Sequence, residues 1–550
     1  MILNEPERQP NEAALFNSGA TLLERLVPSI RRQNVNTITF TRSKDFLAAP
    51  LLHNWRHIWY ERQKLNMTKT RPALGSILIG IAALCSCNVA SAQAATHFYT
   101  ITVDYTLSRL SVEARFEYPV KSVTARSRNA GRYLLDVREC GDDTNIRMRN
   151  RRMMLPDNGI ACLNYTVDLE RAAKEHRYAG ELAPRNIIAS PSFWLWRPEL
   201  HNETKIHAKF HLPVDVKVSV PWQQLDDSGT EFQLGRSPEN ASTPAVFGRF
   251  DYREIEVPGS TLRVALLEGR KVMNNEAVAS WVRATATDVS LAYGRFPNPS
   301  PQIVVIPITG STSAVPFGQV IRDGGETVEL TINPDEPIEA YLADWKATHE
   351  FSHLMLPYIT RDQRWISEGF AQYYQNVLQT QSGAYDETYA WQKIYDGLER
   401  GRLARPELSP NEAAADGSRS GSMKVYWSGA AIALMADVEL RERSSGKEGL
   451  NDVLGRFQSC CLPSQDVWSG PEFFAKLDTL ISEPLFMRLY KRYADTAGFP
   501  DTSDLLTRLG VSAANGEISL KRNAELRSIR DSITEADGMA AHWRSALFSN

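Results

Sequence analysis

The sequence has little cysteine and almost no net charge. Only 6 of its 550 residues are cysteine and no Cys-x-x-Cys pair occurs, which excludes a disulfide-framework protein and a Cys-x-x-Cys zinc or redox motif. Lys and Arg number 62 against 65 Asp and Glu, a net charge of −3 that excludes a strongly basic nucleic-acid binder. A mean hydropathy of −0.34 excludes a protein with many membrane spans. The length is sufficient for two to four domains.

A segment with the build of a secretory signal peptide lies at residues 67–94 rather than at the start of the chain. Lys69 and Arg71 supply its positive region, the mostly apolar run 77–89 follows, and Ala92-Gln93-Ala94 offers a cleavage site. An apolar helix of this length is too short for a hydrocarbon core of ~30 Å. We therefore predict an exported protein, periplasmic or secreted.

The internal position of this segment makes Met67 the expected initiator. We predict that residues 1–66 are a mis-assigned upstream extension that is disordered or absent from the mature protein. If they are translated, the apolar run becomes an internal membrane anchor. A lipoprotein signal ending at Cys87 is a further alternative, which Cys85 disfavours because it does not suit the lipobox.

Export would leave four cysteines in an oxidising compartment. Cys140 and Cys162 flank a polar, Arg-rich loop and could close it as a disulfide, worth about 3 kcal/mol for a loop of this size. The adjacent Cys460 and Cys461 pair with each other only under strain, so their pairing is left open.

Residues 95–270 have the pattern of a β-rich, sandwich-like domain. The run 98–103 is aromatic and β-branched, and 214–220 alternates valine with polar residues, the period of two that marks a half-buried strand. Similar runs recur between clusters of Pro, Gly, Asn and Asp. This spacing of short strands predicts an all-β domain.

The chain changes character after about residue 270. Apolar residues return at helical spacing over 274–293, and 302–308 has the composition of a buried strand. Two further strands are predicted over 314–321 and 327–332, joined by a turn at Asp323-Gly324-Gly325. Together these patterns predict a mixed α/β segment.

Long helical patterns then continue to about Tyr493, with interruptions near Gly383 and Pro406. We predict a helical domain over 401–505. The remaining residues, 506–550, show no strong pattern and are predicted to form a C-terminal tail.

The sequence His349-Glu350-Phe351-Ser352-His353 is the feature that carries chemistry. Asp335 is a plausible N-cap, Pro337 suits a first turn, and nothing breaks a helix over 338–356 before Pro357. Residues four apart share one helix face, so the two histidines could bind one metal ion. The glutamate between them would point beside the ion, where a base for a metal-bound water should lie.

This motif class is expected by chance only about 0.02 times in such a chain. A zinc site needs a third protein ligand and an open position for water. Residues 365–374 predict a second helix with Glu368 in its opening turn, and 14 residues separate Glu368 from His353. That spacing allows the second helix to pack against the first and bring Glu368 to the same ion. The alternative is a solvated glutamate beside surface or core histidines.

On these residues the sequence resembles the gluzincin metallopeptidases. It is most similar to the glycyl aminopeptidase family, and more distantly to the alanyl aminopeptidase and leukotriene A4 hydrolase group. A third stretch, Tyr426-Trp427-Ser428-Gly429 leading into 435–441, resembles the Tyr-x-x-Gly helix of the family. The resemblance spans about residues 96–505, and the three motifs occur in family order.

The resemblance implies three zinc ligands, a general base and a donor to the oxyanion of the tetrahedral intermediate. By motif position these are His349, His353 and Glu368 as ligands, Glu350 as base and Tyr426 as donor. Zinc lowers the pKa of its bound water towards ~7, which suits a glutamate as proton acceptor.

Two positions depart from the family pattern. Gln372, one turn after Glu368, stands where these enzymes tend to have an acidic residue, so a neutral amide would orient His349. The stretch 315–321 has no glutamate matching the acidic anchor by which the alanyl aminopeptidase group holds the substrate amino terminus. An extended peptide could still pair with that edge strand. The sequence therefore leaves open whether the protein removes single N-terminal residues or cleaves internal peptide bonds.

We therefore predict a multidomain α+β protein, with a β-sandwich-like domain over 95–270, a thermolysin-like catalytic domain over 271–400 and a helical domain over 401–505. The predicted function is an exported zinc-dependent peptidase acting on peptide or protein substrates, with no nucleic-acid partner and no membrane contact beyond export. One alternative is a zinc hydrolase of non-peptide substrates. The other is a degenerate fold serving as a periplasmic binding or assembly module.

Overall fold

The computed structural model describes residues 95–141, 146–149, 152–200, 204–235 and 243–535. All of these residues fall within one compact unit. The predicted upstream extension (1–66), the predicted signal peptide (67–94) and Cys87 lie outside the described residues. Within the described ranges, no helix has the length and apolar character needed to cross a bilayer.

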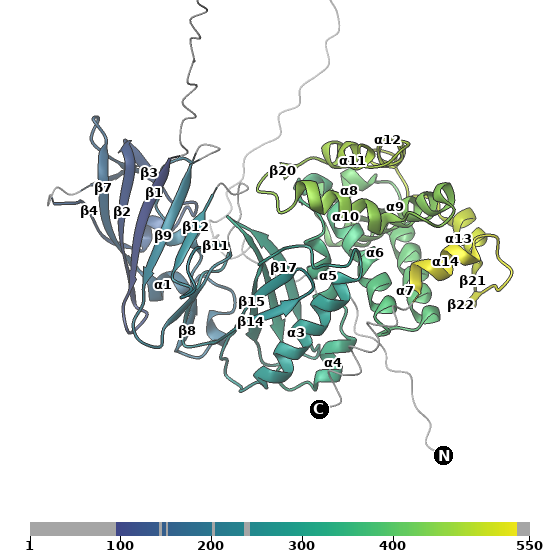
Figure 1. Cartoon of the computed structure of the whole chain (residues 1–550), viewed down its shortest axis with the longest axis horizontal. Helices are drawn as coiled ribbons and strands as arrows, with labels where there is room; N and C mark the ends of the chain where they lie inside the picture. The colour runs from purple at the N-terminus through teal and green to yellow at the C-terminus, as the bar shows by residue number, and fades with distance from the viewer. Residues whose placement is uncertain (1–94, 142–145, 150–151, 201–203, 236–242, 536–550) are drawn as a thin grey trace, which may run out of the picture. The chain divides into compact units, whose positions relative to one another are not determined.

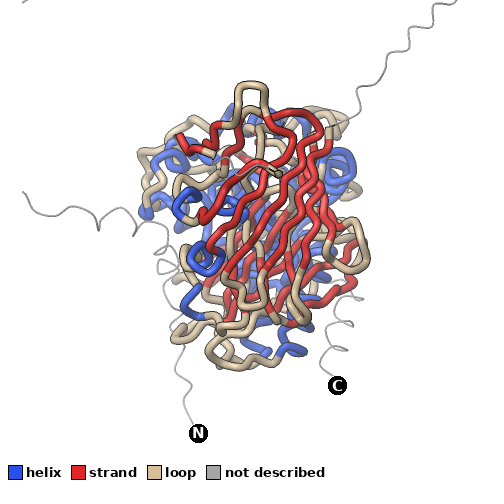
Figure 2. The backbone as a smooth tube through the Cα atoms, turned by 90° about the vertical axis from the view of Figure 1, so that its left-hand side faces the viewer, coloured by secondary structure: helices blue, strands red, loops and turns tan. Residues whose placement is uncertain are grey.

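The N-terminal part is built on a large, mostly antiparallel sheet whose strands run side by side in Figure 2. Along the first strand Tyr99, Ile101 and Val103 are buried and alternate with more exposed residues, and the strand predicted over 98–103 is confirmed. The order across the sheet is β11 (Gln223–Gln224), β12 (Glu231–Leu234), β9 (Lys205–His211), β1 (Thr96–Val103), β2 (Arg109–Val120), β7 (Ile160–Asp168) and β4 (Leu134–Glu139).

Short strands and helices complete this part. The three-stranded sheets are β10 (Lys217–Ser219), β13 (Val246–Gly248) and β8 (Asn186–Ile188), and β3 (Ser122–Thr124), β6 (Arg152–Met154) and β5 (Arg147–Arg149). The short helices are η2 (Ala130–Arg132), α1 (Leu169–Ala173), η3 (Ala179–Glu181) and α2 (Pro191–Trp194). A disulfide joins Cys140 to Cys162, as the sequence suggested, with 5.4 Å between their Cα atoms.

The strand predicted over 214–220 is shorter than its alternation indicated. Asp215 has a left-handed backbone with φ of 67°, and Val214 is 81% exposed. The strand therefore begins only at Lys217. A turn residue with positive φ interrupts the pleat, and the valine before it loses its place on the buried face.

A second sheet lies in the middle of the chain (Figure 1). Its order is β14 (Asp251–Val257), β15 (Ser260–Leu266), β16 (Gln302–Pro307), β18 (Glu326–Ile332) and β17 (Phe317–Arg322). The predicted strands over 302–308, 314–321 and 327–332 are confirmed as β16, β17 and β18. Strand β17 lies at the edge and pairs antiparallel with β18.

The domain boundary predicted at residue 270 cuts this sheet and is wrong. Strands β14 and β15 precede it, yet β15 pairs in parallel with β16. Helix α3 (Asn275–Ser290) connects the two, since parallel neighbours need a crossover connection, usually a helix. The periodic pattern identified the strands correctly but did not show which sheet they join.

The single helix predicted over 338–356 is two helices, α4 (Ile338–Ala343) and α5 (Lys346–His353). The break falls at Asp344, whose backbone is extended and whose carboxylate accepts hydrogen bonds from the backbone N–H and the ammonium of Lys346. Pro337, rather than the predicted Asp335, occupies the N-cap of α4. A local side-chain hydrogen bond to the backbone competes with the helix here.

The helical part that follows packs into the same hydrophobic core as the middle sheet, so the predicted boundary at 400/401 does not separate two cores. Its elements are β19 (Tyr358–Ile359), η4 (Arg361–Gln363), α6 (Trp365–Gln381), α7 (Glu387–Leu403), α8 (Pro410–Asp416), η5 (Arg419–Gly421), α9 (Ser422–Ser444), α10 (Leu450–Cys461), β20 (Val467–Trp468), α11 (Gly470–Asp478) and α12 (Phe486–Tyr493). The predicted interruptions near Gly383 and Pro406 fall between helices. Cys460 and Cys461, whose pairing was left open, are joined to each other.

The predicted tail over 506–550 is wrong for its described portion. Residues to 535 form α13 (Ser503–Leu509), the hairpin β21 (Val511–Ala514) and β22 (Glu517–Leu520), and α14 (Arg527–Thr534). Ile533 is fully buried, and Arg530 forms an ion pair with Glu387 of α7. Each element is so short that its apolar period does not stand out, and its stability comes from packing on α6 and α7.

Candidate metal centre

Two neighbouring helices bring the predicted metal ligands together. His349 and His353 lie one turn apart on α5, and Glu368 lies in the first turn of α6. Oε2 of Glu368 is 3.3 Å from Nε2 of His349 and 3.4 Å from Nε2 of His353. Among the described residues these three form a group whose donor atoms all lie within 4.8 Å of one another. Helical spacing and the packing of α5 on α6 thus produce a three-donor cluster.

Hydrogen bonds behind the rings orient both histidines. Nδ1 of His349 is 2.8 Å from Oε1 of Gln375, and Nδ1 of His353 is 2.9 Å from Oγ of Ser367. The amide oxygen only accepts, so the Nδ1 of His349 carries a proton, and its Nε2 faces Glu368 in the cluster. This arrangement fits a divalent metal, because a zinc ion binds neutral imidazole nitrogen and carboxylate oxygen.

The residue that orients His349 was assigned wrongly from the sequence. Gln372 was expected behind the ring, but Gln375 occupies that place. Gln375 follows Glu368 by seven residues, two helical turns, and therefore lies on the same face of α6. Ser367 was missed as well, although it precedes Glu368 directly. Both could have been found by projecting α6 as a helix around Glu368, had its contact face with α5 been known.

The charges in the cluster favour a cation. Burial raises the pKa of Glu368, but the His353 charge and the hydrogen bond to His349 outweigh it and hold that pKa well below its usual range. Burial lowers the pKa of His349, but the hydrogen bond to Glu368 and the charge of Glu350 more than offset this and leave it raised. A buried carboxylate that stays ionised between two imidazoles is a favourable place for a metal ion.

Glu350 lies beside the cluster and against the edge of the middle sheet. A Cβ atom at Gly318 of β17 would lie 2.5 Å from Cγ of Glu350, so the glycine makes room for the side chain. Burial raises the pKa of Glu350, and the charges of His353 and His349 offset this only in part. The predicted base thus lies beside the three donors and against β17, an edge strand of its sheet.

Tyr426 reaches the cluster from α9. Its ring centroid is 5.8 Å from that of His349, and its hydroxyl hydrogen-bonds with Glu368. Burial and the neighbouring carboxylates raise its pKa well above the usual value, so the phenol stays protonated and can donate. All five residues predicted from the sequence therefore converge on one place.

Two glycines set the distance between α6 and α9. A Cβ at Gly369 would overlap the backbone of Gly429, and a Cβ at Gly429 would overlap the carbonyl oxygen of Trp365. Only glycine permits so close an approach of two helix backbones. Glu368 precedes one glycine and Tyr426 lies one turn before the other, so this contact places the third ligand beside the phenol.

A cavity of about 120 Å³ opens next to Glu350. Its walls are mostly apolar, and the ammonium of Lys346 at its rim is held by Asp344 and Ser313. The lining residues are Pro316, Phe317, Gly318, Trp345, Lys346, His349, Glu350, Gln372, Met423, Tyr426 and Trp427. A cavity of this size and polarity suits one apolar side chain of a substrate.

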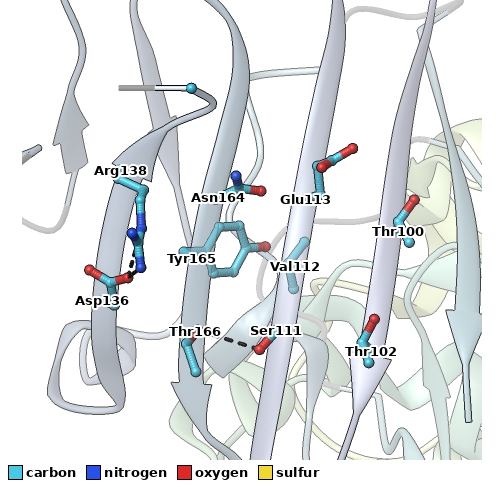
Figure 3. Close-up of a pocket in the computed structure, with 11 residues that line it drawn as sticks. Thr100, Thr102, Ser111, Val112, Glu113, Asp136, Arg138, Asn164, Tyr165 and Thr166 are labelled. Carbon is cyan, nitrogen blue, oxygen red and sulfur yellow. Dashed lines mark hydrogen bonds and ion pairs between the residues drawn. The ribbon is translucent and has the colours of Figure 1, made fainter. Parts of the chain in front are cut away.

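A larger hollow, of about 660 Å³, lies on the open face of the seven-stranded sheet (Figure 3). Thr100 and Thr102 of β1, Glu113 of β2 and Asn164 of β7 point into it. Oγ of Ser111 lies 3.4 Å from Oγ1 of Thr166 across neighbouring strands. None of the five predicted site residues lines this hollow.

Comparisons with solved structures support the fold. No family model and no curated protein sequence matches this chain. Among solved structures it is similar to an aminopeptidase N family protein from Idiomarina loihiensis, with a TM-score of 0.56 and 14% identity over 76% of this chain and 78% of that one. An M1 zinc metallopeptidase from Deinococcus radiodurans matches with a TM-score of 0.44 and 11% identity, over 74% and 94%.

The fold therefore belongs to the mixed α/β, multidomain class seen in aminopeptidase N proteins. At this identity the likeness establishes the fold and leaves the chemistry to the site. The narrower resemblance to the glycyl aminopeptidase family stays a prediction.

Proposed function

We propose that this protein is a zinc-dependent peptidase, with His349, His353 and Glu368 as the ligands. One observation carries the proposal: three donor atoms converge within 4.8 Å, beside the carboxylate of Glu350 and the phenol of Tyr426. A chance pair of histidines would not also have a third donor and an ordered hydrogen-bond partner behind each ring.

Zinc bound there supplies Lewis acidity toward a carbonyl oxygen and a water molecule. The carboxylate of Glu350 takes the proton of the attacking water and returns it to the leaving amine. The hydroxyl of Tyr426 donates a hydrogen bond to the carbonyl oxygen as negative charge develops on it. The edge of β17 holds the peptide backbone by strand pairing, which brings the bond to Glu350.

Metal analysis and one matched pair of variants test this proposal. Purified protein should hold close to one zinc per chain, and Glu350→Gln should retain the zinc while peptide cleavage falls at least 100-fold. Glu339→Gln, at an exposed position of α4, is the control and should cleave like wild type. Less than ~0.3 zinc per chain contradicts the metal centre. Full zinc without cleavage favours a binding or assembly module.

We also propose that the protein is exported, on the basis of the signal-like segment 67–94. Intact-mass analysis of the protein from the periplasmic fraction or the medium should give an N-terminus near Ala95. A lipid on Cys87 would indicate membrane anchoring instead. A mature chain that retains residues 1–66 contradicts the proposed start at Met67.

A further inference from the structure

A groove of about 470 Å³ follows the edge of β17 beyond the catalytic residues. Four consecutive residues of the strand, 319–322, line it. Side chains of consecutive strand residues point to opposite faces of a sheet. A cavity that touches all four therefore runs along the strand's edge, where unpaired backbone groups are presented.

This edge is available for strand pairing. β17 pairs with β18 on one side and lies at the end of its sheet. Within the described ranges, no backbone–backbone hydrogen bond joins β17 to a segment other than β18. Toward its N-terminal end, Gly318 contacts Glu350 and lines the 120 Å³ cavity. One strand thus runs from the side-chain cavity, past the predicted base, into an open groove.

The opposite wall of the groove comes from the β-rich part and carries Arg177. The guanidinium of Arg177 lies 4.5 Å from the ring centroid of Phe317, and its Nη2 is 3.4 Å from Oε1 of Gln319. The carboxylates that line the groove have hydrogen-bond partners. Glu329 contacts His176 and Gln319, and Glu175 accepts from Tyr133.

Glu329 is 1% exposed, with Oε2 3.2 Å from Nε2 of His176 and Oε1 3.1 Å from Nε2 of Gln319. The hydroxyl of Tyr133 donates to Glu175. The lining of the groove thus carries carboxylates as well as the guanidinium of Arg177.

We propose that this groove binds the part of a polypeptide that lies N-terminal to the scissile bond, so that the protein is an endopeptidase. The inference rests on the peptidase function proposed above. A substrate pairing antiparallel to β17, as β18 does, places its N-terminal residues beside 319–322 and its following residues beside 316–318. Four residues in extended form span about 13 Å. Water adds across the internal C–N bond, giving one new carboxylate and one new amine.

A peptide series with a free or acetylated N-terminus tests the groove in the zinc-loaded, full-length protein. The peptides share one sequence beyond the cleavage site and carry one, two, three or four residues before it. We expect the acetylated peptide with four residues before the cleavage site to be cleaved at that internal bond. Its kcat/KM should be at least tenfold above that of the peptide with one residue before the site. Glu350→Gln should cleave neither, which excludes a contaminating protease.

Filling the groove provides a second readout. Val320→Trp adds bulk on the lining of the groove, and Val272→Trp makes the same substitution at a side chain that is 96% exposed. We expect Val320→Trp to remove most of the gain from N-terminal extension through a higher KM, and Val272→Trp to keep it. Zinc content and the thermal midpoint of both variants show whether they are folded. If Val320→Trp does not fold, the peptide series with the wild-type protein still decides the question.

The outcomes separate the two proposals. Stepwise release of single N-terminal residues, with no cleavage of acetylated peptides, overturns the endopeptidase inference and leaves the zinc peptidase intact. No cleavage of any peptide by zinc-loaded protein overturns both. Equal kcat/KM across the length series shows that the groove does not bind substrate.

Discussion

Side chains behind the metal donors decide how the donors point. His349 and His353 supply nitrogen atoms, but Gln375 and Ser367 determine which nitrogen of each ring faces Glu368. Partners of this kind raise ligand basicity and hold the ring in place before the metal arrives. The neutral amide at Gln375 means that His349 is oriented without a second carboxylate.

Replacing Gln375 by methionine removes the acceptor behind His349 with little change in volume. We expect zinc affinity to fall about 10–100-fold, because the ring loses its fixed tautomer and orientation. Competition with a chromogenic chelator measures the affinity. Gln372→Met is the matched control on the same helix and should bind zinc like wild type, since Gln372 lines the cavity and not the histidine ring. An equal loss in both variants contradicts this assignment.

Tyr426→Phe removes the hydroxyl beside Glu368. We expect kcat to fall about 10²–10³-fold with KM and zinc content nearly unchanged, because the phenol acts on charge that develops in the transition state. Tyr374→Phe removes another buried hydroxyl, bonded to Asn451 at 2.9 Å, and should leave kcat unchanged. A Tyr426→Phe protein with kcat within threefold of wild type shows that the phenol takes no part in catalysis.

At the scale of elements, the site depends on how closely α6 and α9 approach. α5 contributes two donors by its own period, but the third donor and the phenol come from helices that touch at Gly369 and Gly429. Two of the functional residues are therefore positioned by a contact that no local pattern encodes.

Gly429→Ala inserts a methyl group into this contact. We expect unfolding free energy to fall by about 1–3 kcal/mol, with weaker zinc binding because Glu368 shifts with α6. Gly421→Ala is the control: a Cβ there meets Oγ of Ser418 at 3.5 Å, an ordinary contact. Urea unfolding and zinc titration of both variants check the prediction. Wild-type stability in Gly429→Ala would falsify the tight contact.

At the scale of the whole molecule, the β-rich part is joined to the middle sheet by specific polar contacts. Nη1 of Arg126 is 3.0 Å from Oδ1 of Asp323, and Nε2 of Gln302 donates to Oγ of Ser219 at 3.0 Å. These contacts hold the wall that carries Arg177 against the edge of β17. Any loss of stability in the seven-stranded sheet should therefore affect the groove.

The seven-stranded sheet should lose stability in mild acid because of His97. This side chain is fully buried, and burial lowers its pKa while Glu117 offsets this only in part. Below the ordinary value of 6.5 the unfolded chain binds a proton that the folded chain does not, so stability falls as the pH drops from 6.5 toward the folded pKa. For a single proton the slope is at most about 1.4 kcal/mol per pH unit.

Thermal midpoints at pH 7.5 and pH 5.0 measure this effect. His97→Phe should reduce the difference between the two midpoints. Other acidic groups contribute equally to wild type and variant and cancel in the comparison. The same pH dependence in wild type and His97→Phe would show that groups other than His97 cause the loss of stability in acid.

Features with a local cause could be predicted from the sequence. The strand at 98–103 follows from its aromatic and β-branched composition, and the strand at 302–308 follows from a continuous apolar run. Convergence of His349 with His353 follows from the helical period of 3.6, although the helix is shorter than predicted. These signals need only a few neighbouring residues, so a single sequence contains them.

The sequence by itself determined that His349, Glu350 and His353 lie together, because their spacing is a property of one helix. Tertiary structure decided the rest: that Gln375 and not Gln372 supports His349, that β14 and β15 join the second sheet, and that an open groove continues along β17. Each of these depends on which faces pack together. That choice is made by burial summed over the whole chain, and no short segment records it.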